Sequence, residues 1–223
     1  MFGLDEQIAA LGQGEVFAAV AVIAVLLGLR HATDPDHLAA VSTLVAGDRS
    51  GARGAGRLGF VWGMGHATSL VVFGIPIVLS HAYLPGGFQT AAETAVGLII
   101  IALAVRLLRR WRRGDLHGHN RPTRSPLQAY GIGLAHGMGG SAGVGVLLLA
   151  GVPDHVEALA ALVLFSFFTA ASMTIASSTL GAVLARGPVL RGYAAAVPAL
   201  GALSLAFGCW YALGALHAVP YVL

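Results

Sequence analysis

Six apolar blocks, each long enough to cross a lipid bilayer as a helix, follow one another along this chain. A transmembrane helix needs about 20 consecutive, mainly apolar residues. Only 10% of the residues are charged, whereas an ordinary soluble domain has about 25%. The sequence therefore predicts an all-α, polytopic transmembrane helix bundle, with a single domain over residues 1–223. Its six helices are expected at residues 16–45, 58–80, 90–108, 127–150, 156–185 and 192–217.

The positive charges indicate how the chain is oriented in a cytoplasmic membrane. All 13 positively charged positions are arginines, and most lie in three connections between blocks, around residues 49–57, 109–124 and 186–191. Cytoplasmic loops are enriched in positive charge, so these connections are predicted to be cytoplasmic and both termini extracytoplasmic. The pattern is a topology signal and not a nucleic-acid surface. The N-terminal segment is acidic where a signal peptide would be basic, so we expect no cleavage.

The two halves of the chain resemble each other. Residues 28–47 are similar to residues 133–151 at an offset of about 105 residues. A repeat of three helices inserts upside down, and inverted repeats are a recurrent plan of secondary transporters. We therefore expect one repeat over about residues 1–108, a cytoplasmic Arg/His loop at about 109–126 and a second repeat at about 127–223. Chance likeness between helices rich in glycine, alanine and leucine is the alternative.

A cluster of ionisable side chains interrupts the first apolar block. Arg30, His31, Asp34, Asp36 and His37 are five ionisable groups within eight residues. A charged side chain at the bilayer centre costs about 2.5 to 3.5 kcal/mol on insertion scales, so such groups normally mark an ion or proton path. The alternative is that the helix ends before the cluster, which would then be a cytoplasmic loop exposed to water.

Pro35 is expected to break this first helix at the cluster. Proline lacks the N–H that would bond to the carbonyl of His31, and its ring clashes with that carbonyl. Asp34 is then the predicted N-cap of a restarted helix that begins at Pro35. The break lets His31 fold toward Asp36 and His37, which face other directions on a straight helix.

The first side chains predicted to bind a metal are therefore His31, Asp36 and His37. Two imidazoles and a carboxylate suit nickel, cobalt, copper or zinc. Arg30 cannot bind a cation, so we expect it to pair with Asp34 or Asp36, or to balance the charge of the empty site.

Two motifs resemble those of the nickel/cobalt transporter family. Residues 30–38, RHATDPDHL, closely resemble its signature of a histidine, four residues and Asp-His in a transmembrane helix. Residues 60–72, FVWGMGHATSLVV, are similar to its next-helix motif with Gly-His-Ser/Thr. The resemblance implies that His31, Asp36 and His37 are needed for transport, and it adds His66 as a ligand.

The second half of the chain departs from the family pattern. It lacks the family's acidic Asp-Thr motifs and has LAHGMGGS at residues 134–141 instead. The usual members have eight helices, so the chain resembles a compact six-helix branch near urease-accessory membrane proteins. His136, the repeat partner of His31, is a further candidate ligand; its alternative role is an interhelical hydrogen bond, as it is for His66.

Weaker candidates lie elsewhere in the chain. Met64 and Met138 offer thioethers, but a methionine is more often core filler. His117 and His119 could collect metal in the cytoplasmic loop, although long His-rich tracts bind metal more firmly. Three residues could attract cations at the outer end of the fifth helix, or form a solvated helix start: Asp154, His155 and Glu157.

The sequence favours a secondary transporter that takes up nickel or cobalt across the cytoplasmic membrane. It contains no phosphate-binding glycine-rich motif, so we expect no nucleotide. Its lone cysteine, Cys209, excludes an intramolecular disulfide and a cysteine-rich metal site. We expect no enzyme activity and no cofactor besides the transported ion. The alternatives are an accessory or sensor protein that binds metal for a metalloenzyme such as urease or hydrogenase, a metal efflux protein, and a membrane metalloenzyme.

Overall fold

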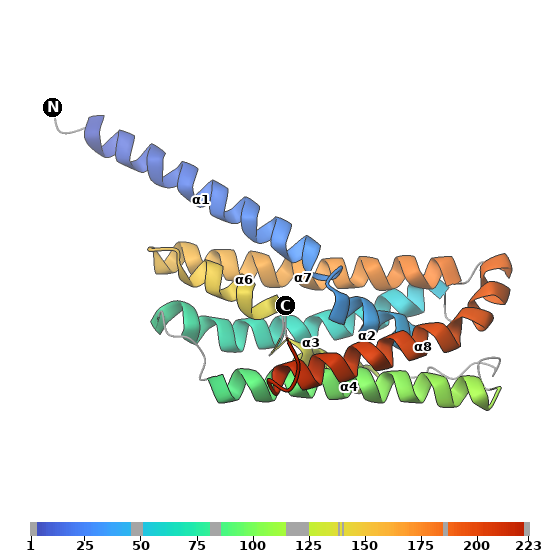
Figure 1. Cartoon of the computed structure of the whole chain (residues 1–223). Helices are drawn as coiled ribbons and strands as arrows, with labels where there is room; N and C mark the ends of the chain where they lie inside the picture. The colour runs from blue at the N-terminus through green and yellow to red at the C-terminus, as the bar shows by residue number, and fades with distance from the viewer. Residues whose placement is uncertain are drawn as a thin grey trace.

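The described part of the chain is entirely helical, as the sequence predicts. The computed structural model describes residues 4–45, 51–80, 86–114, 125–137, 139, 141–184 and 187–220. Within these residues there are eight helices: α1 (Leu4–His31), α2 (Pro35–Val45), α3 (Gly51–Ser80), α4 (Gly86–Arg112), α5 (Pro126–His136), α6 (Ser141–Ala150), α7 (His155–Leu184) and α8 (Gly187–Ala215). Figure 1 shows α3 lying beside α7 and α4 lying beside α8, while α1 leaves the bundle obliquely toward its N-terminal end.

Several helices are long and apolar enough to cross a membrane. Four described segments meet this description alone: Gly51–Ser80, Gly86–Arg112, His155–Leu184 and Val197–Ala215. Phe17–His31 and Pro35–Val45 form a fifth candidate if the pair is one span with a bend of 47°. This pattern is that of a polytopic membrane protein.

The predicted fourth helix, residues 127–150, is not continuous. α5 ends at His136 and α6 begins at Ser141. These helices have 11 and 10 residues, so each rises only about 15 to 17 Å and is too short to cross the bilayer alone. Three of the four residues between them are glycines, which form helix poorly and therefore permit a break where the packing of the neighbouring helices favours one. The expectation of one unbroken helix here is wrong.

Glycines bring the backbones of the central helices together. A Cβ atom added at Gly63 of α3 would lie only 2.9 Å from the Cα atom of Ala170 in α7. Likewise, one added at Gly97 of α4 would lie 2.9 Å from the backbone nitrogen of Ala212 in α8. Helix pairs within a membrane associate through such close approach of small residues, because lipid gives no hydrophobic driving force.

Two interhelical hydrogen bonds fix α1 and α5 against this core. Ser172 of α7 donates its hydroxyl to the carbonyl of Gly28 near the end of α1, at 2.9 Å. Ser69 of α3 donates to the carbonyl of Leu134 near the end of α5, at 2.6 Å. Both bonds therefore hold a helix just before it ends.

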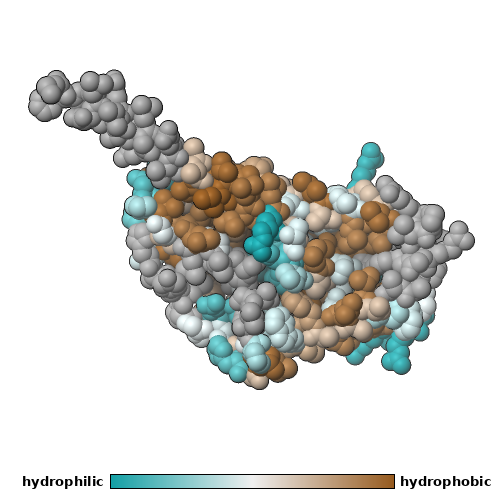
Figure 2. All heavy atoms as spheres, turned by 45° about the horizontal axis from the view of Figure 1, so that its top comes forward, coloured by the Kyte–Doolittle hydropathy of each residue, from teal (hydrophilic) through white to brown (hydrophobic). Residues whose placement is uncertain are grey.

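The outer surface of the bundle is largely apolar. In Figure 2, brown atoms cover much of the coloured surface, with teal atoms gathered at its margins and in one group at the middle. Large apolar side chains are exposed on several helices, among them Leu26, Leu98, Val163 and Leu203. An apolar surface of this extent suits contact with lipid rather than with water.

Replacing Gly133 with alanine is expected to loosen α5 from α3. A Cβ atom at this position would meet the backbone of Trp62 and lie 2.9 Å from the backbone nitrogen of His66. Overpacking of this kind costs about 1 to 3 kcal/mol. We therefore expect a lower midpoint of thermal unfolding for the detergent-purified protein.

Gly131→Ala is the matched control in the same helix, because nothing lies within 4 Å of an added Cβ there. Alanine is also the better helix former, so this variant is expected to be at least as stable as the parent. Equal unfolding midpoints for the two variants would contradict this account of α3–α5 packing.

Candidate metal centre

The chain breaks where the cluster of ionisable side chains lies, as Pro35 predicts. α1 ends at His31 and α2 begins at Pro35. Between them the N–H of Thr33 donates to the carbonyl of Arg30 at 2.8 Å, and the N–H of Asp34 donates to the carbonyl of His31 at 3.2 Å. The carbonyl of Asp34 then accepts the first hydrogen bond of α2. The two helix ends therefore meet at a tight turn, and their ionisable side chains come close together.

Asp34 connects two neighbours on α1. Its Oδ1 lies 3.4 Å from a guanidinium nitrogen of Arg30, and its Oδ2 lies 3.2 Å from Nδ1 of His31. Of the two aspartates considered as partners of Arg30, the structure places Asp34 beside it. The Arg30 side chain is 71% exposed while that of Asp34 is 7% exposed. An aspartate that accepts the Nδ1 proton of a histidine fixes the ring and directs its Nε2 lone pair the other way.

Four histidines from four helices converge beside this turn. His31 of α1, His37 of α2, His66 of α3 and His136 of α5 are each no more than 3% exposed. The ring centroids of His31 and His37 are 4.4 Å apart, those of His37 and His136 are 4.6 Å apart, and those of His31 and His66 are 4.9 Å apart. Asp36 joins them, with its Oδ1 3.1 Å from His37 Nδ1 and its Oδ2 3.3 Å from His136 Nε2.

The potential ligand atoms fall into two overlapping groups of three. One group is His31, His37 and His66, and the other is Asp36, His37 and His136; within each group the ligand atoms all lie within 4.8 Å of one another. His37 belongs to both groups. The trio predicted from the sequence, His31 with Asp36 and His37, is split between them, because Asp36 is turned toward α5.

Three imidazole nitrogens in the cluster are buried without a hydrogen-bond partner: His37 Nε2, His66 Nδ1 and His136 Nδ1. Leaving a buried polar atom unpaired costs about 1 to 3 kcal/mol. Donation of the His37 Nδ1 proton to Asp36 leaves a lone pair on Nε2, the form in which imidazole binds a metal. The cluster thus presents unpaired nitrogen donors inside the protein.

The spacing of the donors suits a transition-metal ion. His31 Nε2 and His66 Nε2 are 2.9 Å apart and share a hydrogen bond, whose proton a bound ion would replace. Two nitrogen ligands that are each about 2.1 Å from one ion and about 90° apart lie about 3.0 Å from each other. Imidazole with a carboxylate suits nickel, cobalt, copper or zinc, whereas magnesium and calcium prefer oxygen ligands.

Aromatic rings enclose the cluster. The Trp62 ring of α3 lies 5.6 Å from that of His37 and 5.8 Å from that of His136, and Phe165 of α7 lies 5.9 Å from His31. Trp62 is buried, and its indole N–H has no hydrogen-bond partner. The sequence analysis assigned no role to Trp62. Its position four residues before His66 places both side chains on one face of the helix, and this spacing could have indicated that Trp62 lies at the site.

Glu93 is a second residue that sequence reasoning missed. It lies within α4, is only 8% exposed and accepts a hydrogen bond from the Gln89 amide at 3.1 Å. Its backbone packs against Gly139, in the break that follows His136. An acidic residue inside an apolar block is itself a signal of function, and the third block contains just this one.

The weaker candidates lie apart from the cluster or outside the described residues. The Met64 side chain is 43% exposed on α3. Asp154 caps α7, since its Oδ1 accepts the N–H of Val156 at 2.8 Å and that of Glu157 at 3.0 Å. This geometry is that of a solvated helix start. Three further candidates, Met138, His117 and His119, lie outside the described residues.

Two comparisons with known proteins give matches: a family model matches the first half of the chain, and a curated protein matches most of it. Residues 17–121 match the NicO family, described as high-affinity nickel-transport protein. The matched residues include His31, Asp36, His37 and His66 and exclude His136. The chain is also 27% identical over 206 residues to the urease accessory protein UreH of Bacillus sp. (strain TB-90), an alignment covering 86% of this chain and 90% of that protein.

A second relative matches over a shorter stretch. The cobalt transport protein NhlF of Rhodococcus rhodochrous is 32% identical over 91 residues, which are 41% of this chain and 26% of that protein. No solved structure matches the chain.

Proposed function

We propose that this chain, which is similar to the NicO family over residues 17–121 and to the cobalt transport protein NhlF over 91 residues, is a secondary transporter that takes up nickel or cobalt ions across the cytoplasmic membrane. The observation that carries the proposal is the buried cluster of four histidines and Asp36 at a helix break between candidate membrane spans. Ionisable groups are rare within membrane helices and normally belong to a path for ions or protons. No catalytic reaction and no resident cofactor are part of the proposal.

The ligands we propose are His31, Asp36, His37, His66 and His136. Their two overlapping groups offer an ion two neighbouring positions, with His37 as a ligand in both. An ion could then pass from one position to the other without losing all its protein ligands at once. The carboxylate of Asp36 offsets part of the charge of a divalent cation. Arg30 and Asp34 form an ion pair next to the ligands, so this pair adds no net charge to the site.

Inverted repeats are the architecture that we propose for transport. If α1 with α2 and α5 with α6 each count as one broken span, the chain has six spans with both termini extracytoplasmic. In support, the two breaks follow His31 and His136, which are 105 residues apart. Two hydrogen bonds also correspond between the halves. Ser172 of the second half donates its hydroxyl to Gly28, just before the break in the first half, and Ser69 of the first half donates to Leu134, just before the break in the second half. Transporters of this plan bind substrate at broken helices between the repeats.

A membrane-bound accessory protein is the second candidate function. It is favoured by the similarity to a urease accessory protein over 86% of this chain. Such a protein would bind the ion in the same cluster and deliver it to a metalloenzyme, without moving it across the membrane.

Flux into proteoliposomes separates the two functions. We expect purified protein in sealed vesicles to move nickel and cobalt ions into the lumen, where a trapped metal-sensitive dye reports them. Manganese should move less, because it binds nitrogen ligands more weakly than nickel or cobalt. Vesicles without protein and vesicles with the His37→Ala variant are the controls. Binding of metal to the protein without flux would support the accessory function and reject transport.

A further inference from the structure

Glu93 is a buried acidic residue outside the proposed set of ligands. Its side chain is 8% exposed and lies on the buried face of α4, at helical spacing from Val96 and Ile100. Its carboxylate accepts a hydrogen bond from the Gln89 amide at 3.1 Å. An ionisable group buried within a membrane helix normally belongs to a path for ions or protons. The place of Glu93 relative to the histidine cluster therefore decides which step it can serve.

The backbone of Glu93 lies against the break between α5 and α6. A Cβ atom added at Gly139, within that break, would lie 3.0 Å from the backbone nitrogen of Glu93. His136 precedes Gly139 by three residues, and three residues span at most about 11 Å. The His136 ring in turn lies beside Asp36, with Nε2 3.3 Å from Oδ2. The break thus joins the surroundings of Glu93 to one of the two ligand groups.

The packing of α2 against α4 also places Glu93 near the start of α2. Ala39 packs against the core cluster that contains Val96, and Leu44 belongs to the same cluster as Leu103, farther along α4. The two helices therefore run in the same direction. Glu93 precedes Val96 by three residues, and the aspartate ligand of α2 precedes Ala39 by three residues. The two carboxylates are thus within about one helical turn of each other in height.

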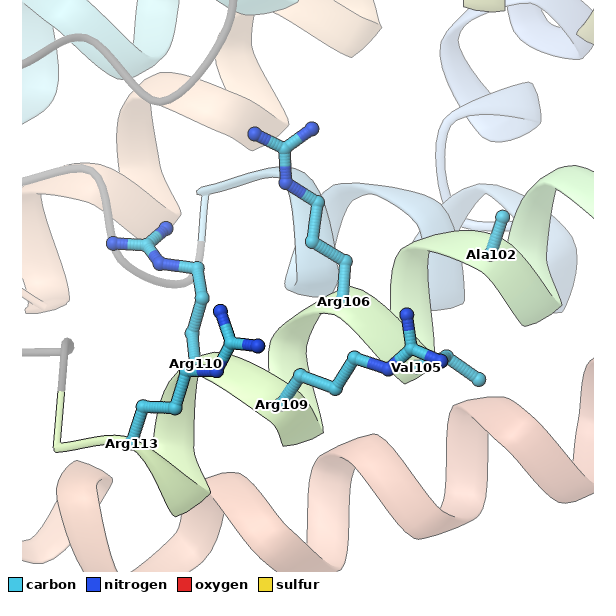
Figure 3. Close-up of a pocket in the computed structure, with 6 residues that line it drawn as sticks. All are labelled: Ala102, Val105, Arg106, Arg109, Arg110 and Arg113. Atoms are coloured by element: carbon cyan, nitrogen blue, oxygen red, sulfur yellow. The ribbon is translucent and has the colours of Figure 1, made fainter.

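The two ends of α4 differ in charge. Four arginines line a hollow at its C-terminal end: Arg106, Arg109, Arg110 and Arg113. Figure 3 shows their side chains extending from this end of the helix. In the topology proposed above, the positive-inside rule makes this end cytoplasmic. Glu93 follows the first residue of α4, Gly86, by only seven residues, so it lies toward the extracytoplasmic end.

We propose that Glu93 holds the divalent metal ion on its way from the extracytoplasmic surface to the histidine cluster. Gln89, one helical turn nearer that surface, is exposed, whereas Glu93 is buried beside the break. A carboxylate in such a place attracts a hydrated cation, which exchanges water for imidazole nitrogen at the cluster. A single carboxylate binds the ion weakly, which suits an intermediate position. This role rests on the proposed transport function and describes its entry step.

The test measures the initial rate of radioactive nickel uptake against the external nickel concentration, in cells that lack other nickel importers. Glu93→Gln removes the charge but keeps the size of the side chain and an acceptor for the Gln89 amide. We expect half-maximal uptake to need an about 10-fold higher nickel concentration, with the maximal rate retained, because only the approach of the ion is impaired. Glu93→Asp, which keeps the charge, should recover most of this difference.

Nickel binding to the purified protein shows whether the effect is confined to entry. Equilibrium dialysis of Glu93→Gln should give the affinity of the parent, because the ligands of the cluster remain. The matched control is Glu157→Gln, which removes a glutamate from the first turn of α7, at the same side of the membrane in the proposed topology. This variant should take up nickel like the parent.

Three outcomes would overturn the role of Glu93. The first is an unchanged half-maximal concentration in Glu93→Gln. The second is an equal rise in Glu157→Gln, which would indicate a general effect of surface charge. The third is loss of nickel binding by purified Glu93→Gln and Glu93→Asp alike, which would indicate a structural role. Absence of uptake by the parent itself is a different result, because it rejects the proposed transport function and this role with it.

A second variant is available if Glu93→Gln does not reach the membrane. Gln89→Lys places an ammonium group next to Glu93 from an exposed position, where a substitution disturbs packing little. The ammonium offsets the charge of the carboxylate, so the half-maximal concentration should again rise by about 10-fold. Uptake by Gln89→Lys that saturates like the parent would overturn the role of Glu93.

Discussion

Replacing His37 with alanine is expected to abolish nickel uptake by cells that lack other nickel importers. His37 is the one residue common to both ligand groups, so its loss leaves neither group with three ligands. Even the outer partners of metal ligands contribute about 10- to 100-fold to metal affinity, so removal of a shared ligand should reduce uptake by at least about 100-fold. The measurement is accumulation of radioactive nickel at equal protein abundance in the membrane.

His155→Ala is the control for this substitution. His155 lies exposed at the start of α7, away from the histidine cluster, so its loss should leave uptake unchanged. Unchanged uptake in His37→Ala, with the protein present in the membrane, would show that the cluster does not lie on the ion path. An equal decrease in both variants would point to a general effect of removing a histidine.

The variants His66→Ala and His136→Ala are expected to impair uptake while leaving one ion-binding position intact. Without His66, the ligands Asp36, His37 and His136 remain, and without His136, the ligands His31, His37 and His66 remain. Each variant should therefore still bind nickel, with an affinity lowered by about 10- to 100-fold. Uptake should fall by at least the same factor, because an ion that moves between two positions needs both.

The double variant of His66 and His136 distinguishes two positions from one. It should lose nickel binding as completely as His37→Ala, since neither group then has three ligands. Titration of the purified variants with nickel, followed by equilibrium dialysis, measures this directly. If His66→Ala alone abolishes binding and His136→Ala has no effect, then a single position made by His31, His37 and His66 accounts for the site.

The helical class and the first break could be predicted because local chemistry determines them. Long apolar blocks must form helices in lipid, where every backbone polar group needs an internal partner. Pro35 ends the hydrogen-bond pattern of α1 wherever the rest of the chain lies. The family resemblance added His66 through its motif on the next helix. Each of these features is determined by a short stretch of sequence and could therefore be predicted from that stretch alone.

Other features depend on how distant helices pack, and they were not predictable in this way. The break between α5 and α6 involves no proline, and glycines within a membrane helix are as compatible with close packing as with a break. The division of the ligands into two groups of three also depends on packing between distant helices. Asp36 turns toward His136, 100 residues away in the sequence, and this contact follows from the packing of α5 against α3. Spacing along one helix could not reveal it.

The most direct test of the account is the ligand environment of nickel bound to the purified protein, measured by X-ray absorption. The account predicts imidazole nitrogens at about 2.1 Å from the metal, and the loss of this signal together with bound nickel in His37→Ala. Nickel surrounded only by oxygen ligands, or bound equally well by the His37→Ala protein, would contradict it.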